Sequence, residues 1–474
     1  MSFYHPDSSI QRMPPEVLGK IFSLTRPIKV YKWSPAAHKA PLLLCRVCSK
    51  WRAIAISTPC LWDSLKITIG EHAPTPRFPL IESFVSRARG RPLNFVLDGH
   101  GRWYGTDAVK EIVDRIQDIY VPRIAQWQHG NITIHSRTTG RPLPPISYGS
   151  AAMLKHLHMT VLFDSNDRAQ QLESISHAVN VFGPAPGLRY LYLGAPRELL
   201  QHFLAVHWEF LEELYCPLEM TAYACFRIFM QCPSLDTCTA DIGEHNPATD
   251  IPLQAFPPGQ TIFPRLRDLG LVVNADITAL LNAVTLPGLE VFSAMQSCEG
   301  EPPAPDPRPP WPHATFISLL ERSSCRLTYL SLIHMPITDA ELIECLRHMK
   351  DLDLLDVRTH EDETIITDEF LTAFTFSVDP FEEDLPSDTL CPRLTKLTLI
   401  EADISTTDGV LANMVESRYG VLQDIDLDVP LGNKKDIRYF RSEGAWKMPD
   451  RMAKRLERAA RYVSDSDVES EDSE

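Results

Sequence analysis

The sequence lacks any run of about 18 apolar residues, the length that a helix needs to cross a bilayer. Its start has no basic stretch followed by an apolar one, so we expect neither a membrane span nor a secretory signal. Glycine is scarce, with 21 residues against 39 prolines, which indicates many connections between short elements rather than a long helical bundle. Because 44% of the 474 residues are hydrophobic, the chain can fill about two to four domains, or one domain and a repeat array.

Positive charge is also in short supply. The chain has 46 Lys and Arg against 62 Asp and Glu, a net charge of −16, and its last eleven residues carry six acids and no base. Such a field does not attract phosphates, so we expect no nucleic-acid partner and no membrane partner. The odd number of cysteines, eleven, without a leader predicts reduced thiols and a cytoplasmic or nuclear location.

Motifs of catalysis are missing. The sequence contains no HExxH, no G-x-S-x-G and no G-x-x-x-x-G-K-[ST], so we expect no enzyme, no cofactor and no metal. His156-x-His158 has no third ligand at a matching spacing, and Asp424-x-Asp426-x-Asp428 lacks the glycine and glutamate of an EF-hand. Cys45-x-x-Cys48 lies in an apolar helical pattern without a second pair, which favours packing over metal or redox use.

Two short helices are predicted near the amino end. Pro14 and Pro15 suit a first helical turn, and an apolar stripe follows at Val17, Leu18, Ile21 and Phe22. A second helical pattern runs over 44–55, and a strand is predicted over 65–69. Helices this short bury too little surface to be stable alone, so we expect part of their apolar surface to await a partner.

The residues from Met13 to Phe22, together with Leu-Cys-Arg-Val-Cys-Ser-Lys-Trp-Arg at 44–52 and Thr-Pro-Cys-Leu-Trp at 58–62, resemble the F-box in the form abundant in mushroom-forming fungi. Met13 departs from the usual leucine, and the spacer between the helices is longer than in the shortest F-boxes. The resemblance implies docking onto the small adaptor subunit of cullin–RING ubiquitin ligases. For each matching position, a role in the internal core of the helices is the alternative to contact with the adaptor. These positions are Met13, Pro14, Pro15, Val17, Leu18, Ile21, Phe22 and Trp51.

A Leu-x-x-Leu-x-Leu-like hexamer recurs ten times in the rest of the chain. Five of the nine steps between copies are 23 to 28 residues long, within the range of leucine-rich repeats, and the longer steps indicate insertions. The chain therefore resembles a leucine-rich-repeat protein, although coincidence in an ordinary α/β chain is the alternative. The asparagine or cysteine expected three positions after each hexamer appears only as Asn274, which predicts an irregular solenoid. The hexamers begin at Leu154, Leu188, Leu211, Leu235, Leu266, Leu289, Leu327, Leu352, Leu394 and Leu422.

The predicted fold class is α/β: an N-terminal helical F-box followed by an irregular leucine-rich-repeat solenoid, with strands on the concave side and helices on the convex side. The predicted parts are a tail at 1–9, the F-box at 10–66, a linking segment with the first irregular repeats at 67–149, the repeat region at 150–430, a basic helix segment at 431–463 and an acidic disordered tail at 464–474. The proline-rich insertion at 301–312 is an inert stiff loop or a docking peptide. The serines that precede acids in the tail are candidate phosphorylation sites, with a bare solubilising tail as the alternative; they are Ser464, Ser466 and Ser470.

Hexamer positions 2, 3 and 5 are expected to face outward, where repeat proteins bind. These positions hold nine acids and four bases, which indicates a protein target with a basic segment, with an ordinary solvated sheet face as the alternative. The candidate substrate-binding residues are Tyr190, Tyr192, Tyr215, Tyr329, Asp353, Asp356, Asp424 and Asp426.

Taken together, the resemblances imply the substrate-recognition subunit of a cullin–RING ubiquitin ligase, which binds the adaptor and an unknown protein target. A scaffold whose F-box holds the adaptor without degradation is the second class. An enzyme with an unrecognised site is the third.

Overall fold

The structure is a computed structural model. It describes residues 9–26, 36–69, 75–99, 107–135, 151–162, 185–194, 208–245, 256, 260–296, 309–359, 366–377, 389–400, 406–427 and 433–441. The chain divides into two compact units: the first is Met1–Leu218 with Gln231–Ser234, and the second is Glu219–Met230 with Leu235–Glu474. Most of the proline-rich insertion, the basic residues from 447 onward and the three tail serines lie outside the described residues.

The first unit begins with short helices: α1 (Ser9–Arg12), α2 (Pro15–Ser23), α3 (Leu44–Val47), α4 (Ser49–Ser57) and the 3-10 turn η2 (Pro59–Leu61). Pro15 opens α2, where a missing backbone N–H costs nothing. The Cys48 sulfur accepts a hydrogen bond from the Trp51 backbone N–H at 3.4 Å and caps α4. Buried Leu18, Phe22 and Ile54 supply the core of these helices.

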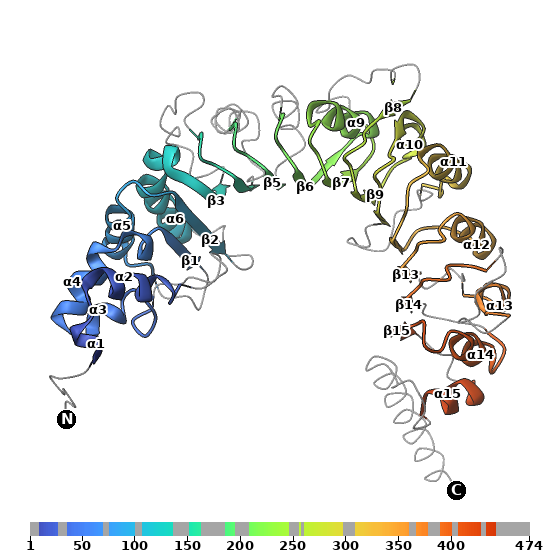
Figure 1. The fold of residues 1–474 in the computed structure, drawn as a ribbon. Helices are drawn as coiled ribbons and strands as arrows, with labels where there is room; N and C mark the ends of the chain where they lie inside the picture. The colour runs from blue at the N-terminus through green and yellow to red at the C-terminus, as the bar shows by residue number, and fades with distance from the viewer. Residues whose placement is uncertain are drawn as a thin grey trace, which may run out of the picture. The chain divides into compact units, whose positions relative to one another are not determined.

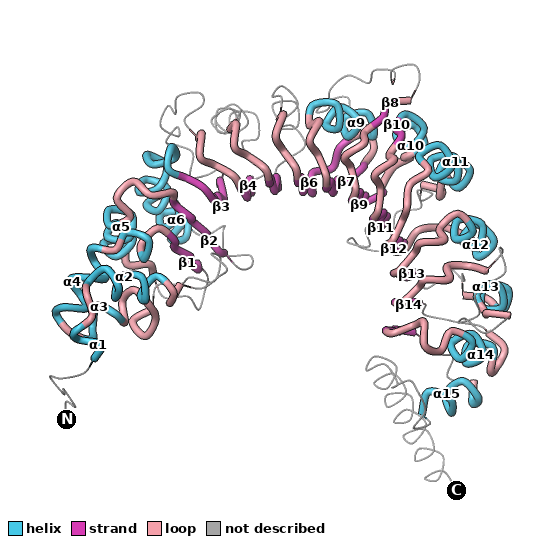
Figure 2. The backbone as a smooth tube through the Cα atoms, in the orientation of Figure 1, coloured by secondary structure: helices cyan, strands magenta, loops and turns pink. Residues whose placement is uncertain are grey.

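A parallel sheet follows in the same unit, in the order β1 (Ser64–Ile69), β2 (Leu93–Gly99), β3 (Trp127–His135), β4 (His156–Leu162), β5 (Tyr190–Gly194) and β6 (Glu213–Met220). The strand predicted over 65–69 is confirmed by β1. Between strands the chain forms α5 (Phe78–Arg87), α6 (Asp107–Tyr120) and η4 (Val121–Gln126). Figure 2 shows the alternation of these helices with the strands.

The second unit repeats the alternation. Its strands pair in parallel in the order β7 (Thr237–Ile242), β9 (Asp268–Val273), β11 (Val291–Met295), β12 (Tyr329–Ile333), β13 (Leu354–Arg358), β14 (Lys396–Ile400) and β15 (Asp424–Leu427). A short pair joins β8 (Thr261–Ile262) to β10 (Val284–Thr285). The helices are α9 (Ala222–Gln231), α10 (Thr278–Ala283), α11 (His313–Ser323), α12 (Asp339–Arg347), α13 (Asp368–Phe374), α14 (Val410–Ser417) and α15 (Lys434–Arg441). Figure 1 shows α11 to α14 along one side of their strands.

Every hexamer predicted from the sequence contains a strand that begins at its third residue. Equivalent positions pair in register, so that Leu330 lies beside Leu355 and Leu355 beside Leu397. These leucines are at most 1% exposed, because successive residues of a strand point to opposite faces and the fourth and sixth positions share the core. In the described residues the chain is therefore an α/β protein with a mostly parallel sheet of thirteen strands, six of which begin in the first unit and seven in the second.

Backbone carbonyl groups near the ends of α10 and α13 in the second unit are satisfied by arginine. Arg418, which is 0% exposed, donates to the carbonyl oxygens of Phe374, Leu390 and Cys391 at 2.7, 2.7 and 3.1 Å. Arg322 donates in the same way to the carbonyl oxygens of Leu281 and Val284. These carbonyl groups thus find donors that are distant in the sequence and that the repeat pattern does not reveal.

Candidate protein-binding surfaces

Helices α2 and α3 leave apolar side chains in solvent. Six of the twelve large hydrophobic side chains that are exposed among the described residues lie between Ile10 and Val47. On α2 and at its C-terminal end they are Val17 (42% exposed), Ile21 (37%) and Leu24 (83%), at the spacing that shares one helix face. We call these six residues the N-terminal apolar set: Ile10, Val17, Ile21, Leu24, Leu43 and Val47.

The structure divides the eight residues that the F-box resemblance singles out. Pro14, Pro15, Val17 and Ile21 are exposed, whereas Met13 and Trp51 are half-buried. Leu18 and Phe22 are 0% and 1% exposed and belong to the core, where the Phe22 ring packs on Trp51 with ring centroids 4.9 Å apart. Both alternatives that the sequence left open, a docking surface and the internal core, therefore occur on α2, with Val17 and Ile21 exposed and Leu18 and Phe22 buried.

Four members of the N-terminal apolar set were not singled out by the sequence. Leu24 lies seven residues after Val17, and Leu43 and Val47 are four residues apart, so helical spacing was the available signal. Ile10 carried no such signal, because α1 is a four-residue helix.

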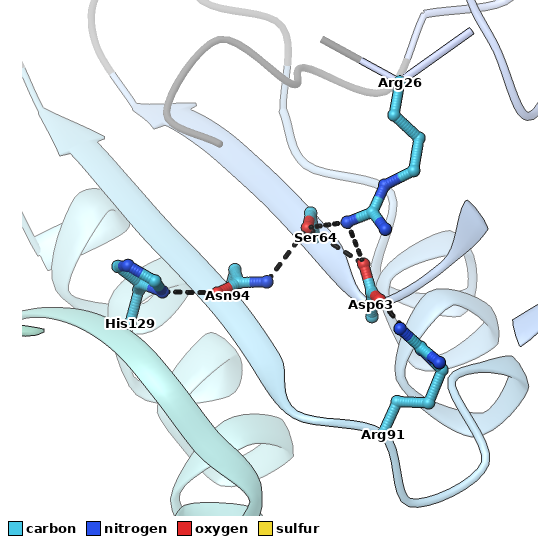
Figure 3. A network of polar contacts seen from close by, with 6 residues as sticks. All are labelled: Arg26, Asp63, Ser64, Arg91, Asn94 and His129. Atoms are coloured by element: carbon cyan, nitrogen blue, oxygen red, sulfur yellow. Dashed lines mark hydrogen bonds and ion pairs between the residues drawn. The ribbon is translucent and has the colours of Figure 1, made fainter. Parts of the chain in front are cut away.

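A chain of polar contacts connects the end of α2 to three strands (Figure 3). Arg26 donates to Asp63 at 2.6 Å, and Arg91 donates to the other carboxylate oxygen at 3.0 Å. Further along, Asn94 donates to the Ser64 hydroxyl at 3.2 Å and accepts from the His129 Nδ1–H at 2.5 Å. Asp63, Ser64 and Asn94 are 3%, 1% and 6% exposed, so this network is internal and fixes the helices to β1, β2 and β3.

Beyond His129, the side chains at the neighbouring positions of the next strands are mostly aromatic rings. The strand register places His129 beside His156, His156 beside Tyr190 and Tyr190 beside Glu213. One residue pair further on, His158 lies beside Tyr192 and Tyr192 beside Tyr215. We call the six rings the aromatic face: His129, His156, His158, Tyr190, Tyr192 and Tyr215.

The rings of the aromatic face contact one another. His129 stacks on His156 with centroids 4.2 Å apart, and His158 stacks on Tyr192 at 4.0 Å with planes 4° apart. Tyr190 is tilted by 32° from His156 and by 38° from Tyr215. The three tyrosines of this face are among the binding residues predicted from the sequence, whereas its histidines are not.

Burial, followed by the neighbouring His156 and Lys155, lowers the pKa of His129 to about 4, below the ordinary value of 6.5. The unfolded chain therefore binds more protons between pH 6.5 and 4, so the stability contribution is complete above pH 6.5 and is lost as the pH falls towards 4. Discounted for solvent screening of this half-buried ring, the loss is about 1–2 kcal/mol.

This pH dependence is measured by urea unfolding of the protein and of H129Q at pH 7.5 and pH 5. We expect the natural protein to lose more stability than the variant on acidification. Equal losses in the two proteins would contradict the environment described for His129.

The remaining candidate residues lie on β12, β13 and β15 of the second unit or, for Asp353, directly before β13. Asp356 is 6% exposed, and both of its carboxylate oxygens accept hydrogen bonds from Arg358 at 2.9 Å. Glu212 pairs with Arg189 at 3.1 Å in the first unit, and Asp236 pairs with Arg267 at 3.5 Å in the second. The surplus of acids counted on the sequence is thus smaller on the folded sheet, because Arg358 follows its hexamer and was not counted.

Tyr329, Asp353, Asp424 and Asp426 are brought onto the same set of strands. Tyr329 is half-buried on β12, and Asp424 is exposed on β15. Asp353 precedes β13 and accepts a hydrogen bond from the Thr395 hydroxyl.

Within the parts of the chain that the structure describes, no group of three or more His, Cys, Asp or Glu is arranged to hold a metal ion. The ten cysteines described there are free thiols. Cys232 and Cys391, which open two hexamers, are 2% and 0% exposed, as expected of packing residues. None of the described helices combines the length and the apolar character that crossing a bilayer requires.

Comparison with known proteins adds little to this description. No family model matches the chain, and no curated protein matches it. A similar solved structure is a protein from Bacteroides fragilis determined as a structural-genomics target, at 12% identity over 67% of this chain and 81% of that chain, with a TM-score of 0.31. A TM-score this low carries no argument about fold or function, so the surfaces are interpreted from their own residues.

Proposed function

We propose that this protein is the substrate-recognition subunit of a cullin–RING ubiquitin ligase. The N-terminal helices would dock onto the small adaptor subunit, and the sheet would bind a target protein. The observation that carries the proposal is the N-terminal apolar set, whose side chains remain exposed on the helices that resemble an F-box.

The size of this set is adequate for docking. Complete burial of a Val, Leu or Ile side chain stabilises by about 1.5–3 kcal/mol, so covering these partly exposed side chains contributes about 1 kcal/mol each. Six of them supply on the order of 6 kcal/mol, and polar contacts at the rim add to this. Leu18 and Phe22 would act indirectly, by holding α2 in place.

The repeat architecture supports the second half of the proposal. One strand per hexamer, parallel pairing and intervening helices are features of a leucine-rich-repeat solenoid, whose exposed strand face binds protein partners. The protein would catalyse nothing itself and would act by holding its target near the ligase. Ten free thiols are compatible with work in the reducing cytoplasm or nucleus.

Co-purification of the tagged full-length protein from cells tests the function. Recovery of both adaptor and cullin supports a ligase subunit, adaptor without cullin supports a non-degradative scaffold, and recovery of neither overturns both. Point variants are better controls than a deletion of residues 1–70, since that deletion also removes β1, which pairs with β2.

A further inference from the structure

The row of neighbouring side chains that crosses β1 to β6 is buried at its β1 end and exposed to solvent at its β6 end. Ser64 and Asn94 are 1% and 6% exposed, whereas His156 and Glu213 are exposed and Tyr190 is half-buried. The row therefore emerges at β4 to β6, beside the strands that the internal network fixes to α2 (Figure 3). A ligand on this open part would lie in the same unit as the N-terminal helices.

The open part combines aromatic rings with acid. The tilts of 32° and 38° on either side of Tyr190 leave part of its ring uncovered, and its register partner is the exposed carboxylate of Glu213. No ion pair to Glu213 occurs among the described residues, whereas Glu212 pairs with Arg189. Tyrosine faces attract cations, and a carboxylate beside them strengthens this attraction.

The histidine rings of the face do not oppose a cation at neutral pH. Burial lowers the pKa of His156 and His158 below 6.5, as it does for His129, so these rings are neutral. Lys155, an exposed base beside His156, does repel a cation, and the carboxylates of Glu213 and Glu212, which also act on His156, offset that repulsion.

We propose that the aromatic face, with Glu213, binds an extended protein segment that carries arginine side chains. A planar guanidinium would stack on the uncovered part of the Tyr190 ring while donating to the Glu213 carboxylate, a combination that the compact ammonium of lysine reproduces poorly. The biological role of this segment, as part of the ligase target, rests on the proposed function, but the binding itself does not.

Charge selects this occupant over a nucleic acid. Stacked rings also accept bases, but base-stacking proteins pair their rings with a positively charged groove along the backbone. The exposed carboxylate of Glu213 and the net charge of −16 disfavour phosphates instead.

The test uses the full-length protein and a fluorescein-labelled peptide of about twelve residues in which arginine alternates with serine. Matched peptides replace every arginine by lysine, which has the same charge, or by citrulline, which is neutral and nearly isosteric. Fluorescence anisotropy is measured at two salt concentrations. We expect the arginine peptide to bind at least about 5-fold more tightly than the lysine peptide, to outbind the citrulline peptide by more, and to weaken with salt.

Substitutions on the aromatic face test whether the arginine peptide binds there. Y190L combined with Y215L keeps the net charge and is expected to raise the Kd about 10-fold or more, whereas Y190F retains the ring and most of the affinity. E213Q is expected to raise the Kd about 3-fold to 5-fold. The matched controls Y419L and E369Q, at an exposed ring and an exposed acid of the second unit, should leave the Kd unchanged. Circular dichroism shows that each variant is folded.

Equal affinities for arginine and lysine peptides, with no effect of Y190L/Y215L, would reduce the binding to general attraction by an acidic chain and overturn the proposal. Tighter binding of a single-stranded oligouridine at this face would overturn it as well. The outcome is separable from that of the proposed function, because Val17 and Ile21 variants should leave peptide binding intact and Y190L/Y215L should leave adaptor binding intact.

Discussion

Replacement of Val17 and Ile21 together by glutamate is expected to raise the Kd for the adaptor at least about 100-fold. Both side chains are exposed on one face of α2, at 42% and 37%, so the free protein accommodates the change within about 0.5 kcal/mol. In the complex, the same change buries two unpaired carboxylates against an apolar surface, at a cost of several kcal/mol. Isothermal titration of purified adaptor into each protein measures the difference.

Two controls accompany the Val17 and Ile21 variant. I262E changes an equally apolar side chain, 63% exposed on β8, and should leave adaptor binding unchanged. L18A removes a side chain that is 0% exposed, so it should lower the free energy of unfolding by about 2–4 kcal/mol. Full adaptor affinity in the V17E/I21E protein would remove α2 from the docking surface.

Replacement of Arg418 by methionine is expected to lower the free energy of unfolding by about 3–5 kcal/mol. The guanidinium serves three carbonyl oxygens and lies 4.0 and 4.1 Å from the ring centroids of Phe374 and Phe376. Burial lowers its pKa to about 10, so it remains charged at pH 7 and its hydrogen bonds are charge-assisted. Methionine fills the space but leaves three buried carbonyl groups without their donor.

Urea unfolding measures the cost of R418M. R418K retains a charge but loses the planar fork, so an intermediate loss of about 2 kcal/mol is expected. R347M, at an exposed arginine of α12, should change the stability by less than about 0.5 kcal/mol. A loss below about 1 kcal/mol in R418M would show that the three carbonyl groups find other partners.

The strands were predictable because each repeat must place its own apolar side chains in the core, and this requirement produces the leucine hexamer. The fourth and sixth residues must face the core, and the hexamer that begins at Leu327 shows both of them buried, at Leu330 and Leu332. The first strands were harder to predict. β3 begins at Trp127 and contains Gly130, where a β-carbon would lie only 2.7 Å from the Trp127 ring, so its pattern departs from leucine spacing.

The docking and binding surfaces were only partly predictable, because each depends on neighbours that are distant in the sequence. Val17 and Leu18 are adjacent and equally apolar, yet one is 42% exposed and the other 0%. Which of them faces outward is decided by the packing of α2 against α4. His129 joins the aromatic face through the register of β3 with β4, which a single strand does not encode.

Hydrogen–deuterium exchange of the full-length protein, with and without saturating adaptor, tests most directly whether the exposed apolar side chains of α2 and α3 are a docking site. The account predicts slower exchange of backbone amides within 10–24 and 43–47, and unchanged exchange at the aromatic face and throughout the second unit. Unaltered exchange in α2 when the adaptor is bound, or the absence of any complex at micromolar concentrations, would contradict it.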